Sequence, residues 1–191
     1  MNNVENLLLP NYGVVQTRLP KELYDLLLKE CLNNKNKKPM ISGLTQEGVA
    51  KHFFISKKNT NEITTFVGKM IDEYNKKFPP YLANLNFLDK NLPFGFSAPW
   101  INYQKKNEYI PLHKHDGIFS YNIWMKIPVE SIFEFSFNSI IGTDLNYKLK
   151  LNKKDEGRVI LFPSLLHHLV YPFYKSEETR ISIAGNILLK T

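Results

Sequence analysis

The sequence predicts a mainly β fold with flanking helices. From about residue 98 onward, apolar residues recur mostly with a period of two, the spacing of a strand with one buried face. Two segments of the first half have the 3.6-residue period of helices. The 191 residues can bury a substantial core, and no repeat, low-complexity tail or linker indicates a second domain. We therefore expect one domain over 1–191, with a strand and buttressing helices in 1–97 and the β core in 98–191.

The first half is expected to begin with a strand over 12–17 and a helix over 19–32. Pro20 near the helix start has its φ angle already fixed for a first turn. The apolar residues Leu23, Leu27 and Cys31 would share one face of this helix.

A second helix is expected from Asn59, which forms a capping-box-like pair with Glu62, to Pro79-Pro80. Its apolar residues follow the helical period: Ile63, Phe66, Val67, Met70, Ile71 and Tyr74. Both helices are expected to buttress the outer face of a sheet.

The second half contains the strand-forming segments. A run rich in aromatic and β-branched residues covers 119–127. Further on, Phe133, Phe135 and Phe137 would form one strand face, and Tyr147, Leu149 and Leu151 another. The polar segment 33–38 is predicted to be a loop, and 153–157 a hairpin turn.

Four of the five histidines fall into two tight clusters. His113 and His115 are two residues apart, so in an extended strand both imidazoles lie on one face and can bind one ion. A third ligand would come from the doublet His167-His168, of which only one member can face inward. A histidine pair of this spacing also occurs in cupins and zinc sites. Together with a later histidine and an Arg-x-Ser sequence, it indicates a more specific type of site.

These residues resemble the Fe(II)/2-oxoglutarate-dependent oxygenase superfamily, and most closely the small oxygenases of bacterial and phage genomes. The resemblance covers about 100–186 and rests on 100–104, 111–117, 120–128, 157–164, 168–170 and 180–186. It implies a double-stranded β-helix, the jelly-roll or cupin-like core, in which two antiparallel sheets hold a metal at one open end.

The resemblance implies Fe(II) bound by His113, His115 and His168. At His115 the family has an aspartate, so this chain departs from the usual two-histidine, one-carboxylate set. Three neutral histidines also leave three positions on the iron, but the ion keeps more positive charge. Asp116 could supply the carboxylate only if the backbone turns at Asp116-Gly117, because neighbouring residues of a regular strand point to opposite faces. We favour the three histidines over a set that includes Asp116.

The resemblance also implies a site for the cosubstrate 2-oxoglutarate. Arg180 would pair with its distal carboxylate, and Ser182 would place a hydroxyl beside it. A planar guanidinium matches a carboxylate, and the two-residue spacing puts both side chains on one strand face. Tyr103 takes the place of a tyrosine that the family often uses here, and neighbouring Asn102 fits less well.

The expected function is a dioxygenase that hydroxylates a substrate, a small molecule or a protein side chain, and releases succinate and CO2. One alternative is a cupin-type three-histidine dioxygenase without cosubstrate, which would not need Arg180. The other is a non-enzymatic β-sandwich binding module whose histidines are structural.

Composition adds expectations about location and partners. Cys31 is the only cysteine, so no internal disulfide is possible and a reducing cytoplasm is the simplest location. No apolar run has transmembrane length. The basic region with which a secretion signal begins is not found near residue 1, so secretion is not expected. The net charge of +7 allows an acidic partner, but without an aromatic-basic repeat it does not indicate nucleic acid. The sequence does not indicate an oligomeric state.

Overall fold

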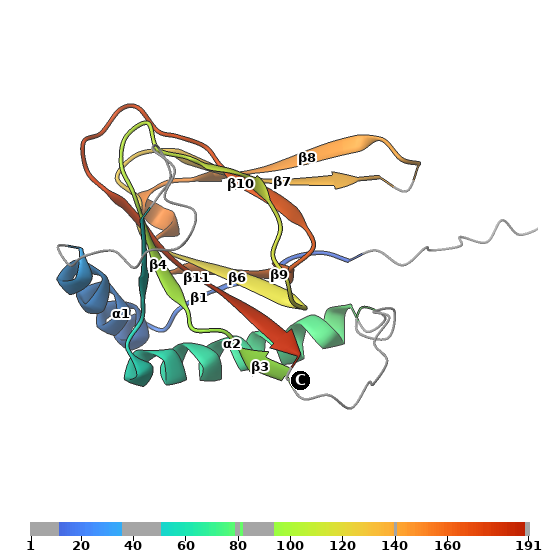
Figure 1. Cartoon of the computed structure of the whole chain (residues 1–191), viewed down its shortest axis with the longest axis horizontal. Coiled ribbons are helices and arrows are strands. Elements are labelled where there is room, and N and C mark those ends of the chain that lie inside the picture. Colours follow the sequence, from blue (N-terminus) through green and yellow to red (C-terminus); the bar gives the residue numbers. More distant parts are fainter. Residues whose placement is uncertain (1–11, 36–50, 79–80, 82–93, 140, 190–191) are drawn as a thin grey trace, which may run out of the picture.

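Two antiparallel β-sheets face each other, and two helices cover the outer face of the larger sheet (Figure 1). This computed structural model describes residues 12–35, 51–78, 81, 94–139 and 141–189. The larger sheet has the order β1-β9-β6-β11-β4-β2, with β3 also paired to β11. Its strands are β1 (Val15–Arg18), β2 (Lys51–Phe54), β3 (Phe94–Phe96), β4 (Trp100–Gln104), β6 (Phe119–Lys126), β9 (Arg158–Pro163) and β11 (Arg180–Leu189).

The smaller sheet has the order β5-β10-β7-β8. Its strands are β5 (Ile110–His113), β7 (Ser131–Asn138), β8 (Asp144–Leu151) and β10 (His167–Val170). The hairpin of β7 and β8 reaches well beyond the rest of this sheet (Figure 1). The short strand β10 contacts the larger sheet through His168, whose ring lies against Phe162 of β9.

Both predicted helices are present, with shifted ends. α1 covers Lys21–Asn34, and α2 covers Lys57–Lys77. The predicted cap at Asn59 is wrong: Ser56 caps α2 by accepting a hydrogen bond from the Asn59 N–H at 3.5 Å. The Asn59 amide instead donates to Glu30 of α1, so a residue that resembles a cap connects the two helices. Pro79 and Pro80 lie outside the described residues.

Three other expectations need correction. The first strand is Val15–Arg18 and not 12–17, and β2 was not predicted. Within 33–38, α1 continues to Asn34, and 36–38 lie outside the described residues. The segment 153–157 is not a hairpin turn. It contains a 3-10 helix, Lys153–Asp155, that carries the chain from β8 in one sheet to β9 in the other.

Strand alternation divides the core into two layers. One layer lies between the helices and the larger sheet, and includes Ile181 and Ile183 of β11. The other lies between the sheets: Trp124, Ile127, Phe133, Phe135, Leu149, Leu151, Ile160 and Phe162. Because successive side chains of a strand alternate, Arg180 and Ser182 face the space between the sheets. No helix in the described part of the chain is long and apolar enough to cross a membrane.

Candidate metal centre

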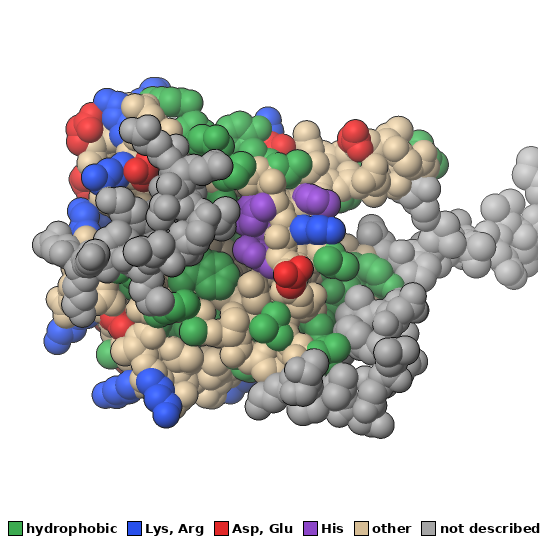
Figure 2. Space-filling model, viewed as in Figure 1, with side chains coloured by type: hydrophobic (Ala, Val, Ile, Leu, Met, Phe, Trp, Pro, Cys, Tyr) green, Lys and Arg blue, Asp and Glu red, His purple; other side chains and the backbone are tan. Residues whose placement is uncertain are grey.

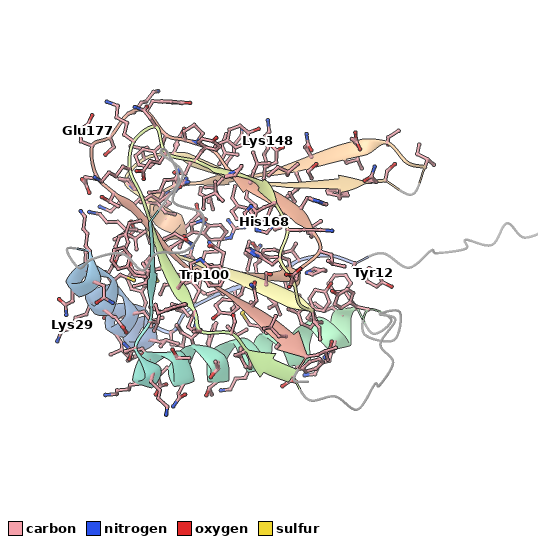
Figure 3. All side chains as sticks on the ribbon, in the orientation of Figure 1. Tyr12, Lys29, Trp100, Lys148, His168 and Glu177 are labelled. Carbon is pink, nitrogen blue, oxygen red and sulfur yellow. The ribbon has the colours of Figure 1, made fainter. Side chains whose placement is uncertain are left out.

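Three histidines from two strands and a loop come together between the sheets. The ligand nitrogens of His113, His115 and His168 all lie within 4.8 Å of one another. His113, at the end of β5, is the direct cross-strand partner of His168 in β10, which brings their ring centroids to 4.2 Å. Histidine side chains are visible near the centre of one face of the molecule (Figure 2), and His168 lies between the two sheets (Figure 3).

Backbone carbonyls fix the orientation of two of these rings. His113 Nδ1 lies 2.8 Å from the carbonyl oxygen of Pro111, and His168 Nδ1 lies 2.9 Å from that of Leu166. A carbonyl only accepts, so each Nδ1 carries the proton and each Nε2 keeps its lone pair. This is the arrangement that histidine ligands of metals usually have.

The environment of His168 keeps its ring neutral. Its side chain is buried, stacked on Phe133 at 15° between planes and 5.5 Å between centroids, with the Phe162 ring at 5.0 Å. Burial, together with smaller contributions from the positive forms of His113 and His115, lowers the pKa of His168 to about 3. Burial also lowers the pKa of His113. Both imidazoles are therefore in the form that binds metal at neutral pH.

The loop after β5 places the third ring. The strand ends at His113, so His115 is not part of the regular strand that the sequence predicted. The His115 N–H donates to the carbonyl of Ser164 at 2.9 Å, and its ring packs edge-on to Trp100 of β4 at 5.8 Å. Gly117 makes the following turn at φ +121°, and an added Cβ there would lie 2.6 Å from the Ile187 carbonyl oxygen. Glycine is thus required for the turn that holds His115 in place.

Asp116 does not join the cluster. It is exposed, and the group of candidate ligands in the described chain comprises the three histidines without it. The cluster therefore offers three imidazole nitrogen donors within reach of one ion. Such a donor set fits Fe²⁺, and also Zn²⁺ or Ni²⁺.

A buried arginine without an acidic partner lies on the same side of the larger sheet. Arg180 is 3% exposed, its Nη2 donates to Gln104 and to the Tyr171 carbonyl (3.2 Å), and its Nη1 has no hydrogen-bond partner. None of the ion pairs among the described residues includes it. Burial lowers the pKa of Arg180 to about 9. A guanidinium left without a counter-charge is suited to bind an anionic ligand.

Other polar side chains on this face surround the same space. Ser182 accepts a hydrogen bond from the Asn102 amide at 3.4 Å, and Asn102 stands opposite it in β4. The Asn102 Oδ1 and the Asn122 Nδ2 are buried without partners. Trp100, which contacts His115, belongs to the same face of β4 as Asn102, so the polar side chains and the histidines share the space between the sheets.

The expectation for Tyr103 is wrong. This side chain lies on the opposite face of β4, in the core beneath α1, where its hydroxyl donates to the Cys31 carbonyl at 2.5 Å and its ring packs against Phe53. Because a strand alternates, the residues of this segment that reach the inter-sheet space are Trp100, Asn102 and Gln104. Sequence reasoning missed Gln104 and Trp100, although their even spacing with Asn102 was a usable signal.

The comparisons with known proteins agree with this geometry. A family model described as "Putative 2OG-Fe(II) oxygenase" matches residues 98–186. The fold is similar to that of a Pseudomonas putida prolyl-4-hydroxylase, with a TM-score of 0.64 and 14% identity over 94% of each chain. No curated protein matches the chain.

Two further structures have the same fold. A Trichoplax adhaerens prolyl hydroxylase, solved with a hypoxia inducible factor peptide, has a TM-score of 0.60 and 12% identity over 92% of this chain and 83% of its own. HygX from Streptomyces hygroscopicus, solved with nickel and 2-oxoglutarate, has a TM-score of 0.57 and 11% identity over 94% and 83%. The predicted mainly β fold with a double-stranded β-helix core is confirmed. The match to the family model covers 89 of the 191 residues, and these include His113, His115, His168 and Arg180.

Proposed function

We propose that the protein is an Fe(II)- and 2-oxoglutarate-dependent dioxygenase. His113, His115 and His168 would hold the iron, and Arg180 with Ser182 would bind the far carboxylate of 2-oxoglutarate. The observation that supports this most is the combination, in one inter-sheet space, of three imidazole nitrogen donors and a buried arginine with no ion pair among the described residues.

Iron and 2-oxoglutarate together supply oxidation by dioxygen, with release of succinate and CO2 and, by default, hydroxylation of the substrate. The protein's own residues bind, orient and exclude water. The rings of Phe133 and Phe162 pack on His168 and form an apolar surface beside the metal position. No acidic or basic side chain is needed to move a proton in this scheme.

Arg180 also separates this function from its alternatives. A three-histidine dioxygenase that works without a cosubstrate has no use for a buried carboxylate site, whereas Arg180 carries a buried charge that no ion pair among the described residues neutralises. In a β-sandwich binding module with structural histidines, the imidazole rings would be expected to form hydrogen bonds with one another. Here Nδ1 of His113 and Nδ1 of His168 each donate to a backbone carbonyl and not to another histidine ring.

We further propose that the substrate presents an apolar group beside the metal. The phenylalanine face of β7 continues outward from buried Phe133 and Phe135 to Phe137, and β8 places Leu145 and Tyr147 on the same side. These last three side chains are 40%, 43% and 59% exposed. Both a small molecule and a protein side chain fit this description. A reducing compartment such as the cytoplasm would suit the iron and the free Cys31 thiol.

The proposal is tested by the order in which the ligands bind. Calorimetry should show one Ni²⁺ per chain, and 2-oxoglutarate should then bind to the nickel-loaded protein but not to the metal-free protein. His168→Ala should lose both binding events. If 2-oxoglutarate binds equally well without metal, or not at all to the loaded protein, the proposed function is wrong.

A further inference from the structure

Among the described residues, Gln104 is the side chain that forms a hydrogen bond with the buried Arg180. The two residues are direct partners across β4 and β11, and Gln104 is itself 3% exposed. Its Oε1 accepts a hydrogen bond from Arg180 Nη2. Its Nε2 donates to two backbone carbonyls, those of Glu108 and, at 3.2 Å, Tyr171.

These contacts leave the amide only one orientation. If the amide were turned over, its NH₂ group would face the guanidinium, which only donates, and its oxygen would face two carbonyls, which only accept. Every hydrogen bond of the group would be lost. The oxygen of Gln104 is therefore directed at Arg180 by the backbone on its other side.

The Tyr171 carbonyl also holds the guanidinium. It accepts from Arg180 Nη2 at 3.2 Å as well as from Gln104, and the Phe173 ring lies 5.6 Å from Arg180 Cζ. Tyr171 is itself fixed, since its N–H donates to Ile132 and its hydroxyl to Glu134. One edge of the guanidinium is thus occupied, while Nη1 is buried with no partner.

We propose that Gln104 is a positioning residue that fixes Arg180 through Nη2 and keeps Nη1 available, and that its neutrality makes the site select a cosubstrate with a second carboxylate. This inference rests on the proposed function. A glutamate at this position would have the same length, but it would neutralise Arg180 and repel the incoming carboxylate. An amide can hold the guanidinium without providing the negative charge, which is left to the ligand.

The test compares two ligands that differ only in the far carboxylate, 2-oxoglutarate and 2-oxopentanoate. Each is titrated by calorimetry into nickel-loaded protein. The unaltered protein should prefer 2-oxoglutarate strongly. Gln104→Glu should lower the affinity for 2-oxoglutarate at least about tenfold, because the new carboxylate neutralises Arg180 and repels the far carboxylate of the ligand. The affinity for 2-oxopentanoate and the nickel content should stay unchanged, so the preference should shrink by the same factor.

Gln16 offers a matched control. Its Oε1 also accepts from an arginine, Arg158 Nε at 3.0 Å, but Gln16 on β1 is exposed and Arg158 on β9 is partly exposed. Gln16→Glu should leave the binding of both ligands unchanged. If Gln104→Glu keeps the full preference for 2-oxoglutarate, or weakens both ligands equally as a merely structural residue would, the inference is overturned.

Two further results keep this inference separate from the proposed function. If the unaltered nickel-loaded protein does not bind 2-oxoglutarate, the proposed function itself fails. If Gln104→Glu does not fold, judged by its thermal melting, Gln104→Met takes its place. This neutral variant removes the hydrogen bonds and should weaken 2-oxoglutarate severalfold but not 2-oxopentanoate, and an unchanged 2-oxoglutarate affinity would refute the positioning role.

Discussion

Replacing Arg180 by methionine should make the ligand-free protein more stable while removing its ability to bind 2-oxoglutarate. Burial lowers the pKa of Arg180 from 12.5 to about 9. At about 1.4 kcal/mol per pKa unit, this corresponds to ~5 kcal/mol by which burial of the charge opposes folding. The variant loses the hydrogen bond to Gln104 and leaves that buried oxygen unsatisfied, at a cost of roughly 1–3 kcal/mol. With the upper end of that cost, a net gain of about 2 kcal/mol remains.

The pH range over which Arg180→Met gains stability follows from the direction in which folding shifts the pKa of Arg180. A cation whose pKa is lowered by folding opposes folding fully wherever it is charged in both states, here at any pH below about 9. The penalty falls as the pH rises from about 9 toward 12.5. The stability gained in Arg180→Met should therefore be the same at pH 6 and pH 8.

Thermal melting with and without 2-oxoglutarate measures both effects. For a chain of this size, about 2 kcal/mol raises the melting temperature by roughly 4–8 °C. Nickel-loaded protein should melt higher when 2-oxoglutarate is added, and Arg180→Met should lose this increase, because removing one partner of a buried charge pair costs about 3 kcal/mol, more than a hundredfold in affinity. Arg158→Met, at a partly exposed arginine of the same sheet, should keep it. The reasoning is refuted if Arg180→Met melts lower than the unaltered protein and still responds to 2-oxoglutarate.

Three further substitution pairs test the metal site. His168→Ala should abolish binding of a divalent ion and His167→Ala should not, because His167 is exposed on the other face of β10; metal analysis showing the reverse would reject the assignment. His115→Asp should retain iron and Asp116→Ala should leave the metal content unchanged, whereas a large loss in Asp116→Ala alone would contradict the three-histidine set. Gly117→Ala should lower both stability and metal content, because Gly117 has a positive φ and the Ile187 carbonyl lies next to it. Gly68→Ala in α2 is the control: nothing lies within 4 Å of its added Cβ, so this variant should be more stable by up to about 1 kcal/mol. Similar melting temperatures for the two variants would show that the turn at Gly117 is not constrained.

The sequence was informative where local spacing decides the structure. The pair His113 and His115 and the pair Arg180 and Ser182 each depend on residues close in the chain, and the structure brings His168 to the first pair through the pairing of β5 with β10. Tyr103 was chosen for its chemical type, although the alternation of β4 turns it toward α1 and turns Gln104 toward Arg180. Whether Tyr103 or Gln104 reaches the inter-sheet space depends on the face of β4 on which each side chain lies.

Other features depend on contacts distant in sequence. β2 is four residues long and forms through pairing with β4, about fifty residues later, which no local pattern reveals. Asn59 was predicted to cap α2, but its side-chain amide binds Glu30. Glu30 lies on α1, and this pairing of two helices leaves no local sequence pattern. The orientation of Arg180 rests on the Tyr171 carbonyl, whose position is set by β7 and not by its own neighbours.

Succinate formation tests the central claim most directly. The purified protein is incubated in air with Fe²⁺, 2-oxoglutarate and ascorbate, alone and with a panel of candidate substrates that carry apolar groups. The three-histidine site and Arg180 together predict succinate above the metal-free level from the unaltered protein, and none above that level from His168→Ala or Arg180→Met. Equal succinate from the unaltered protein and from His168→Ala, or none from a protein that carries one iron per chain and is given every candidate substrate, would contradict the account.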